Sequence, residues 1–285
     1  MTALTERRTV YPTIIDLGSI PIGPINIPLA IHSYGLMLAA AFLTVMFVTQ
    51  RELARKQLDP QLASSVVFAS AVGGIIGAKL YAAFEDGSFS VNELLSTSGL
   101  VWYGGMMGGA AAAFFVLHRS TSPTLPVLDA FAPLFLLGHG IGRIGCFLAG
   151  DGDYGGPSDL PWAMAFPNGT VPIDVPVHPT PLYETGMLFI GFGLLWRLRK
   201  RKEQTPGWLT GGYLILAGGE RFIAEFWRLN PPGLIGLSTP QIFGLVSAGI
   251  GGCLIYWVTH RSSPAEAEDI ATPNPPRRKR TRRRA

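Results

Sequence analysis

Seven apolar stretches, separated by short polar breaks, dominate the hydrophobic pattern of the chain. A helix needs about 20 residues, at about 1.5 Å each, to cross a hydrocarbon core roughly 30 Å thick. Each stretch meets or approaches that length, and no tandem repeat relates them. The pattern therefore predicts seven membrane-spanning helices, at 33–50, 62–84, 100–117, 125–150, 180–196, 208–227 and 239–259.

Composition supports the same class. Of 285 residues, 48% are hydrophobic and 15% are charged, with a mean hydropathy of +0.30, which is too apolar for an ordinary water-soluble chain. The predicted fold class is an all-α integral membrane protein. Its expected parts are an N-terminal arm (1–32), a seven-helix domain (33–260) with a head segment (151–179), and a basic tail (261–285).

The arm is not expected to be a signal peptide. It carries Arg7 and Arg8 near its start, but prolines interrupt the rest of the arm. No compact apolar run precedes a small-residue cleavage site. We expect it to lie along the outer surface of the membrane.

Basic residues predict the orientation. When loops are assigned alternately to the two sides, seventeen of the 23 Lys and Arg residues fall on one side. That side receives 51–61, 118–124, 197–207 and the tail. The other side receives 85–99 and 151–179, which hold seven acids and no Lys or Arg. By the positive-inside rule, the N-terminus is expected to be periplasmic and the C-terminus cytoplasmic.

The tail ends in the basic run "RRKRTRRR", residues 277–284. Two interpretations stay open: attraction to anionic membrane lipids, or a solvated tail that only sets the topology. Nucleic-acid binding is not expected, because the run has no interleaved aromatic residues or folded context.

Polar residues within the predicted helices gather in one half of the membrane. Six helices place them toward the outer ends, whereas the cytoplasmic half is largely apolar. A pore would need polar groups along its whole depth, so the pattern predicts a pocket that opens outward or sideways. The residues are His32, Tyr34, Lys79, Tyr81, Tyr103, His139, Arg143, His178, Tyr183, Glu184, Glu220, Arg221, Glu225 and Arg228.

Arg143 is the most unusual of these residues. A charge at mid-bilayer costs about 2.5–3.5 kcal/mol, so an intramembrane arginine usually marks a functional interior. His139 and Arg143 share one helix face, and Arg221, Glu225 and Arg228 share another. If the faces converge, we expect the arginines to outnumber the nearby acids and to bind phosphate. The alternative is a set of structural Arg–Glu pairs.

Neither cysteine nor metal chemistry is expected. Cys146 and Cys253 fall inside predicted helices and are interpreted as packing residues. "DGDYG", from Asp151 to Gly155, starts like a calcium loop, but Trp162 stands where the bidentate Glu is required.

Paired glycines predict close helix packing between the second, third and fourth helices, because they have small-xxx-small spacing. The pairs are 73 and 77, 104 and 108, 105 and 109, and 138 and 142.

Four segments resemble the prolipoprotein diacylglyceryl transferases of bacterial inner membranes. They are "IHSYGLM" (31–37), "GRIGCFLAGD" (142–151), "HPTPLYE" (178–184) and "RFIAEFWR" (221–228), in the family's order. The likeness spans roughly 11–260 and implies a multi-pass inner-membrane protein with seven helices and a periplasmic head after the fourth.

The resemblance implies transfer of the diacylglyceryl group of phosphatidylglycerol to the lipobox cysteine thiol of a preprolipoprotein, with release of glycerol phosphate. Because the nucleophile belongs to the substrate, no metal, cofactor or enzyme cysteine is expected. Arg143 and Arg221 look like the family's phosphate-handling arginines. The other residues matching its substrate-binding positions are Tyr34, Gly142, Asp151, Glu225 and Arg228.

The chain departs from the family pattern at several positions. Cys146 and Ala149 replace asparagines, and Ala217 replaces a tyrosine. Tyr103 stands where some members have a histidine proposed as general base. Either His139 replaces that base or the field of the arginines lowers the pKa of the substrate thiol.

Other functions stay open. The chain could be a divergent lipid-dependent transferase of the same fold. A transporter is less consistent because no inverted halves or interrupted helices are visible. A retinal-type receptor would need a lysine in 239–259, which has none.

Overall fold

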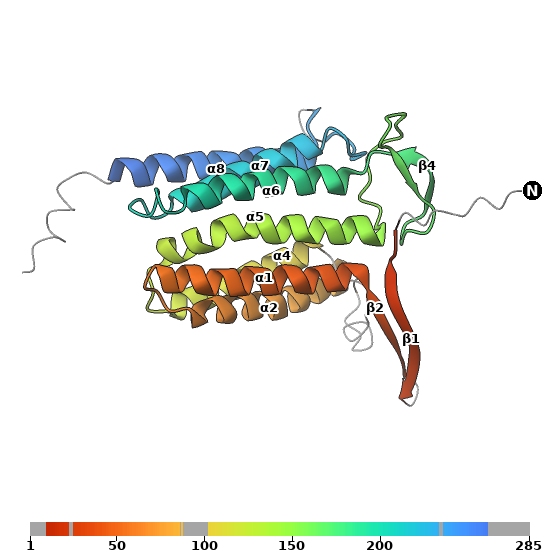
Figure 1. Cartoon of the computed structure of the whole chain (residues 1–285), viewed down its shortest axis with the longest axis horizontal. Helices are drawn as coiled ribbons and strands as arrows, with labels where there is room; N and C mark the ends of the chain where they lie inside the picture. The colour runs from red at the N-terminus through yellow and green to blue at the C-terminus, as the bar shows by residue number, and fades with distance from the viewer. Residues whose placement is uncertain (1–9, 23–24, 86, 88–101, 234–235, 262–285) are drawn as a thin grey trace, which may run out of the picture.

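The computed structural model describes residues 10–22, 25–85, 87, 102–233 and 236–261, so the basic tail after residue 261 lies outside these ranges. Seven helices in the described ranges run roughly parallel, and the strands gather at one end of the bundle, here called the head end (Figure 1). The helices are α1 (Ser33–Arg55), α2 (Gln61–Glu85), α4 (Trp102–Arg119), α5 (Thr124–Ala149), α6 (Thr180–Leu198), α7 (Trp208–Ala224) and α8 (Thr239–Arg261).

Each helix begins within two residues of its predicted start, and the largest differences are at two C-terminal ends. α1 continues through Arg55, because Glu52 is buried there and forms an ion pair with Arg55 at 2.7 Å. α7 ends at Ala224, three residues early. The backbone after it is bound by the head instead, through a hydrogen bond from Gly156 N to Trp227 O of 3.0 Å.

Four of the helices, α1, α2, α5 and α8, are long and apolar enough to cross a membrane. α4, α6 and α7 are shorter, with 18, 19 and 17 residues. Large apolar side chains point out of the bundle. Phe68 of α2, Phe114 of α4 and Ile190 of α6 are 72%, 68% and 67% exposed. Such a surface suits lipid better than water, and the chain is a mostly helical membrane protein.

The arm contains a β-hairpin, an element that the predicted all-α class did not include. β1 (Thr13–Ile22) and β2 (Ile25–His32) pair antiparallel and leave the head end across the direction of the helices (Figure 1). β-branched residues recur in both strands and favour this conformation. Pro21 and Pro28, interpreted as breaks, are tolerated because every strand of a two-stranded sheet has an unpaired edge.

The head segment has a small core of its own. β3 (Met164–Phe166) pairs with β4 (Ile173–Val177), and Phe166 and Val177 are fully buried. The ring of Tyr154 stacks on Phe166 with centroids 4.2 Å apart. This core positions the loop after α5.

The glycine pairs explain one helix contact and not another. A Cβ built on Gly77 of α2 would lie 2.3 Å from the carbonyl oxygen of Gly104 in α4, so only glycine permits this approach. That confirms the predicted packing of the second and third helices. Gly138 of α5 meets Val45 of α1 instead, at 2.7 Å, so its assignment to the same contact was wrong.

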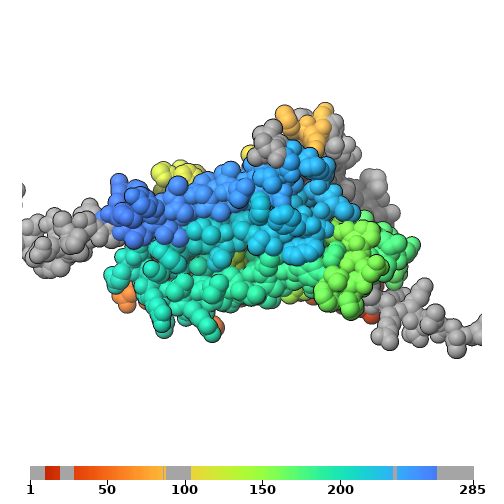
Figure 2. Space-filling model, turned by 90° about the horizontal axis from the view of Figure 1, so that it is seen from above, coloured from red at the N-terminus to blue at the C-terminus, as the bar shows by residue number. Residues whose placement is uncertain are grey.

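α5 is the central helix and carries Arg143. It packs against α1, α6 and α7, and Phe131, Leu134 and Leu136 are each at most 1% exposed. The space-filling view shows α6, α7 and α8 along one face of the bundle (Figure 2). This central place brings the arginine on α5 close to the elements that come after it in the chain.

Candidate active site

A cavity of about 980 Å³ extends from the loop after α5 into the bundle. Its course runs along one face of α5, where Arg143, His139, Phe135 and Phe131 lie four residues apart and all line it. Over that length, about 18 Å along a helix, the lining changes from charged to aromatic. The cavity is therefore polar at the head end and apolar in its depth.

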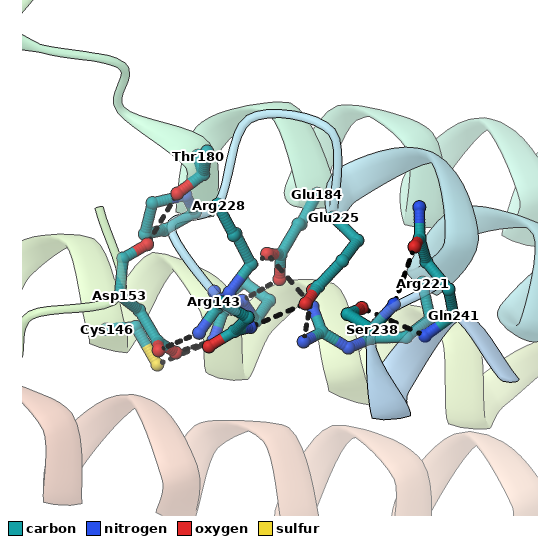
Figure 3. Close-up of polar contacts among 12 residues, drawn as sticks. Arg143, Cys146, Asp153, Thr180, Glu184, Arg221, Glu225, Arg228, Ser238 and Gln241 are labelled. Atoms are coloured by element: carbon teal, nitrogen blue, oxygen red, sulfur yellow. Dashed lines mark hydrogen bonds and ion pairs between the residues drawn. The ribbon is translucent and has the colours of Figure 1, made fainter. Parts of the chain in front are cut away.

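Three arginines meet at the polar end (Figure 3). Arg143 comes from α5, Arg221 from the last turn of α7, and Arg228 from the chain just after α7. All three guanidiniums pair with Glu184 of α6, at 3.9 Å for Arg221, 3.2 Å for Arg228 and a short contact from Arg143 Nε. The faces that were expected to converge do so around this buried carboxylate.

Acids balance the arginines, which corrects the expectation that too few would be present. Asp153 pairs with Arg143 at 2.5 Å and also with Arg228. Glu225 pairs with Arg221 at 2.8 Å. With the shared carboxylate on α6, three carboxylates face three guanidiniums. The sequence interpretation missed this because it counted the acids on the converging helix faces and treated the loop that carries Asp153 only as caps and turns over the pocket.

Asp153 reaches the arginines because the chain reverses direction after α5. Gly150 ends the helix with a φ of 59°, and Gly152, two residues later, has a φ of 94°. Both values lie in the left-handed region, which glycine adopts without strain. The carbonyl oxygen of Asp153 accepts a hydrogen bond from the Thr180 hydroxyl at 2.5 Å. The Asp-Gly-Asp sequence is a turn signal that could have identified this residue.

The head loop also holds Arg228 in place. Gly155 N donates to His178 O at 2.9 Å, and Gly155 forms an isolated β-bridge with Arg228. A Cβ on Gly155 would lie 2.5 Å from Trp227 O, so a larger residue would push the loop away. One short loop thus positions both Asp153 and the guanidinium it binds.

The two aspartates of this loop differ in acidity. Burial alone would raise the pKa of Asp153, but the guanidiniums of Arg143 and Arg228 outweigh it and lower that pKa below its ordinary value. Burial raises the pKa of Asp151, although a hydrogen bond from the Cys146 thiol offsets part of the effect. Asp153 is therefore ionised at neutral pH and pairs with the arginines as a full negative charge.

Cys146 lines the cavity and is more than a packing residue. Its sulfur accepts a hydrogen bond from Arg143 Nη1 at 3.4 Å. The sulfur and the carboxylates of Asp151 and Asp153 offer ligand atoms that all lie within 4.8 Å of one another. Arg143 and Arg228 form ion pairs with Asp153, so guanidinium groups of the protein balance the charge of this carboxylate.

The remaining predicted residues differ in how well they are placed. Tyr34, His139, Gly142 and Asp151 all line the cavity. The side chain of Tyr103, in the first turn of α4, lies outside the described part of the structure.

Glu220 is a fourth carboxyl group near the cluster. It is 5% exposed, and in the described structure its buried Oε1 has no hydrogen-bond partner. It precedes Arg221 on α7 and was noted only as one of the polar residues near the outer face. No spacing argument would have distinguished it from a surface acid.

The arrangement suits an anionic ester that carries long apolar chains. Guanidinium groups bind phosphate oxygens in pairs and stabilise negative charge as it develops. The apolar depth of the cavity accepts hydrocarbon. A phospholipid combines both features in one molecule.

Comparison with known proteins agrees with this chemistry. The family model for prolipoprotein diacylglyceryl transferase matches residues 23–257. A protein of Photobacterium profundum named phosphatidylglycerol–prolipoprotein diacylglyceryl transferase is 32% identical over 272 residues, which cover 91% of this chain and 97% of that protein.

Two further relatives carry the same name. One, from Clostridium tetani, is 33% identical and covers 78% of this chain and 91% of its own length. The other, from Pseudomonas syringae pv. syringae, is 30% identical and covers 92% of this chain and 99% of its own length. The similarity thus spans the bundle, the head and the arginine cluster, and the chain belongs to the prolipoprotein diacylglyceryl transferase family.

Proposed function

We propose that this chain transfers the diacylglyceryl group of phosphatidylglycerol to the lipobox cysteine thiol of a preprolipoprotein. The products are a thioether-linked lipoprotein precursor and glycerol phosphate. The observation that carries the proposal is the arginine cluster at the mouth of an apolar cavity, which matches a phosphate ester joined to two acyl chains. The names of the relatives give the same two substrates.

The reaction forms a carbon–sulfur bond as the bond between the glyceryl carbon and the phosphate oxygen breaks. The electron pair of the broken bond goes to that oxygen, and Arg143 and Arg221 stabilise its growing charge. Arg228 faces the same phosphate position, and Glu225 holds Arg221 in place through an ion pair of 2.8 Å. The substrate supplies the thiol, so every bond that changes belongs to the two substrates.

The thiol must lose its proton, and two sources of help fit the cavity. His139 lines the cavity one helical turn below Arg143 and can accept the proton. The arginines can instead stabilise the thiolate directly. Tyr103 is a poor general base at neutral pH, because a phenol with the ordinary pKa of about 10 is almost entirely protonated there. Tyr34, Gly142 and Asp151 line the part of the cavity where the lipid headgroup would lie.

The orientation belongs to the same proposal. All seven helices cross a bacterial inner membrane, with the arm and head periplasmic and the tail cytoplasmic. Support comes from the basic loops, whose residues Arg55 and Arg199 lie at the end of the bundle away from the head. A reporter active only in the periplasm should be active after residue 165 and silent after residue 203. The reverse pattern would refute the topology.

The function is tested with the purified full chain in nanodiscs that contain phosphatidylglycerol. A lipobox peptide should gain one diacylglyceryl group in a thioether bond, detected by mass spectrometry, and glycerol phosphate should appear in equal amount. Nanodiscs of phosphatidylethanolamine alone are the control. Lipidation of the peptide with no requirement for phosphatidylglycerol would point to a divergent transferase of the same fold.

A further inference from the structure

We propose that Asp153 occupies the phosphate position between turnovers: the lipid phosphate displaces its carboxylate from Arg143 and Arg228, and its return expels glycerol phosphate. This inference rests on the function proposed above. It adds a role for a loop carboxylate in substrate entry and product release.

The geometry of Asp153 is that of a bound anion. One carboxylate oxygen pairs with Arg143 Nη1 at 2.5 Å, and the other pairs with Arg228 Nη2. A single group therefore spans two guanidiniums that belong to different parts of the fold (Figure 3). A phosphate with two free oxygens can make the same pair of contacts.

Asp153 differs from the other carboxylates of the cluster in its setting. Its side chain is 33% exposed and lines the cavity, whereas those of Glu184 and Glu225 are 3% and 2% exposed. Glu184 belongs to helix α6, and Glu225 comes directly after α7. Asp153 lies instead in a loop between glycine turns, where its side chain can rotate away without the loss of a helix.

The cluster holds a hydrogen-bond donor that the carboxylate leaves unused. Arg143 Nη2 is buried and has no hydrogen-bond partner among the described residues. A carboxylate has two oxygens, and both are already engaged by the two arginines. The lipid phosphodiester has two ester oxygens besides its two free ones, and glycerol phosphate has a third free oxygen, so either group can also accept a hydrogen bond from this donor.

Charge balance also favours exchange over simple addition. The three arginines already face three carboxylates. Adding a phosphate to a balanced, largely buried cluster would leave an excess negative charge, which is costly in a poorly hydrated site. Replacing Asp153 by phosphate keeps the balance, because the displaced carboxylate can turn toward solvent.

The test compares Asp153→Asn and Asp153→Ser with the wild-type chain in the phosphatidylglycerol assay. Both remove the competing charge. We expect the KM for phosphatidylglycerol and the inhibition constant of added glycerol phosphate to fall about tenfold, the scale of one charge-assisted hydrogen bond. The turnover number should fall, because product leaves slowly. Asp153→Glu keeps the charge, so its KM, inhibition constant and turnover number should stay near those of wild type.

Two variants separate exchange from bracing. Asp159→Asn removes an exposed head charge and should change neither constant. Glu184→Gln removes the buried brace and should weaken, not tighten, inhibition by glycerol phosphate. If the wild-type chain has no transferase activity, the proposed function is refuted. The exchange is still tested in that case, because the binding of glycerol phosphate to wild type and to the Asp153 variants can be measured by the shift in unfolding temperature.

The proposal is overturned if the neutral variants fold and bind glycerol phosphate no more tightly than wild type. It is also overturned if neither neutral variant folds, because Asp153 would then be a brace that cannot leave the arginines.

Discussion

Asp129, in the first half of α5, caps the start of α7 through Thr210. Its Oδ1 accepts hydrogen bonds from the backbone N–H of Thr210 at 2.8 Å and from the hydroxyl at 2.7 Å, and its Oδ2 accepts from Gly207 N at 2.7 Å. The residue is 2% exposed. These bonds set the register of α5 against α7, and therefore the separation of Arg143 and Arg221 at the far ends of these helices.

Asp129→Ala should destabilise the fold by about 2 kcal/mol or more, because a helix cap and three hydrogen bonds to a buried carboxylate are lost. Thermal unfolding in detergent measures the loss. Asp129→Asn keeps one acceptor and should lose less. Asp174→Ala, at an exposed head aspartate, is the matched control and should unfold like wild type. An unchanged unfolding temperature for Asp129→Ala would mean that the cap does not determine the register.

Arg143→Lys should lower turnover about a hundredfold, the usual cost of removing one preorganised donor from developing negative charge. Lysine keeps the charge but loses the planar fork that spans Asp153 and Glu184. Steady-state rates with phosphatidylglycerol check the effect, and Arg119→Lys, at the exposed end of α4, is the control. If Arg143→Lys turned over at near wild-type rate, the guanidinium would be only a brace.

His139→Gln should lower activity about a hundredfold, the scale of a positioned general base. The defect should be largest below about pH 8 and shrink above it, because a thiol of pKa about 8.5 then ionises unaided. A pH–rate profile of both proteins checks this. A small defect that is flat with pH would assign thiolate formation to the arginines instead.

Cys146→Ala should keep most transferase activity, because the reacting thiol is the substrate's. Its contacts with Arg143 and Asp151 are lost, so a modest fall is expected. Cys253→Ala, at an exposed position of α8, is the control and should match wild type. A loss beyond about a hundredfold in folded Cys146→Ala protein would indicate a covalent intermediate on the enzyme.

The pairing of Asp153 should fail in acid. Its pKa is lowered in the folded protein, so its contribution to stability is fully present above its unfolded pKa of about 4 and is lost as pH falls through the folded value. Between about pH 5 and pH 3, the unfolding temperature of wild type should therefore fall more than that of Asp153→Asn. Parallel curves for the two proteins would show that another group controls acid sensitivity.

The sequence by itself determined the helices and the position of the unusual charge. The apolar stretches and the polar breaks between them are local features of the sequence, so the start of each helix could be predicted within two residues. Arg143 was recognisable because a guanidinium within an apolar stretch needs a partner wherever the stretch lies. The hairpin of the arm was missed, because its prolines exclude a helix but do not exclude an edge strand.

Only the tertiary structure decided which charges meet. Glu184 lies 41 residues after Arg143 in the chain, and Asp153 lies 75 residues before Arg228, so no helical period relates them. Their contacts depend on the cap at Asp129, on the reversal of the chain at Gly150 and on the packing of α5 between its neighbours. Spacing along one helix predicts which residues share a face, but the partner of that face is determined by packing between elements distant in sequence.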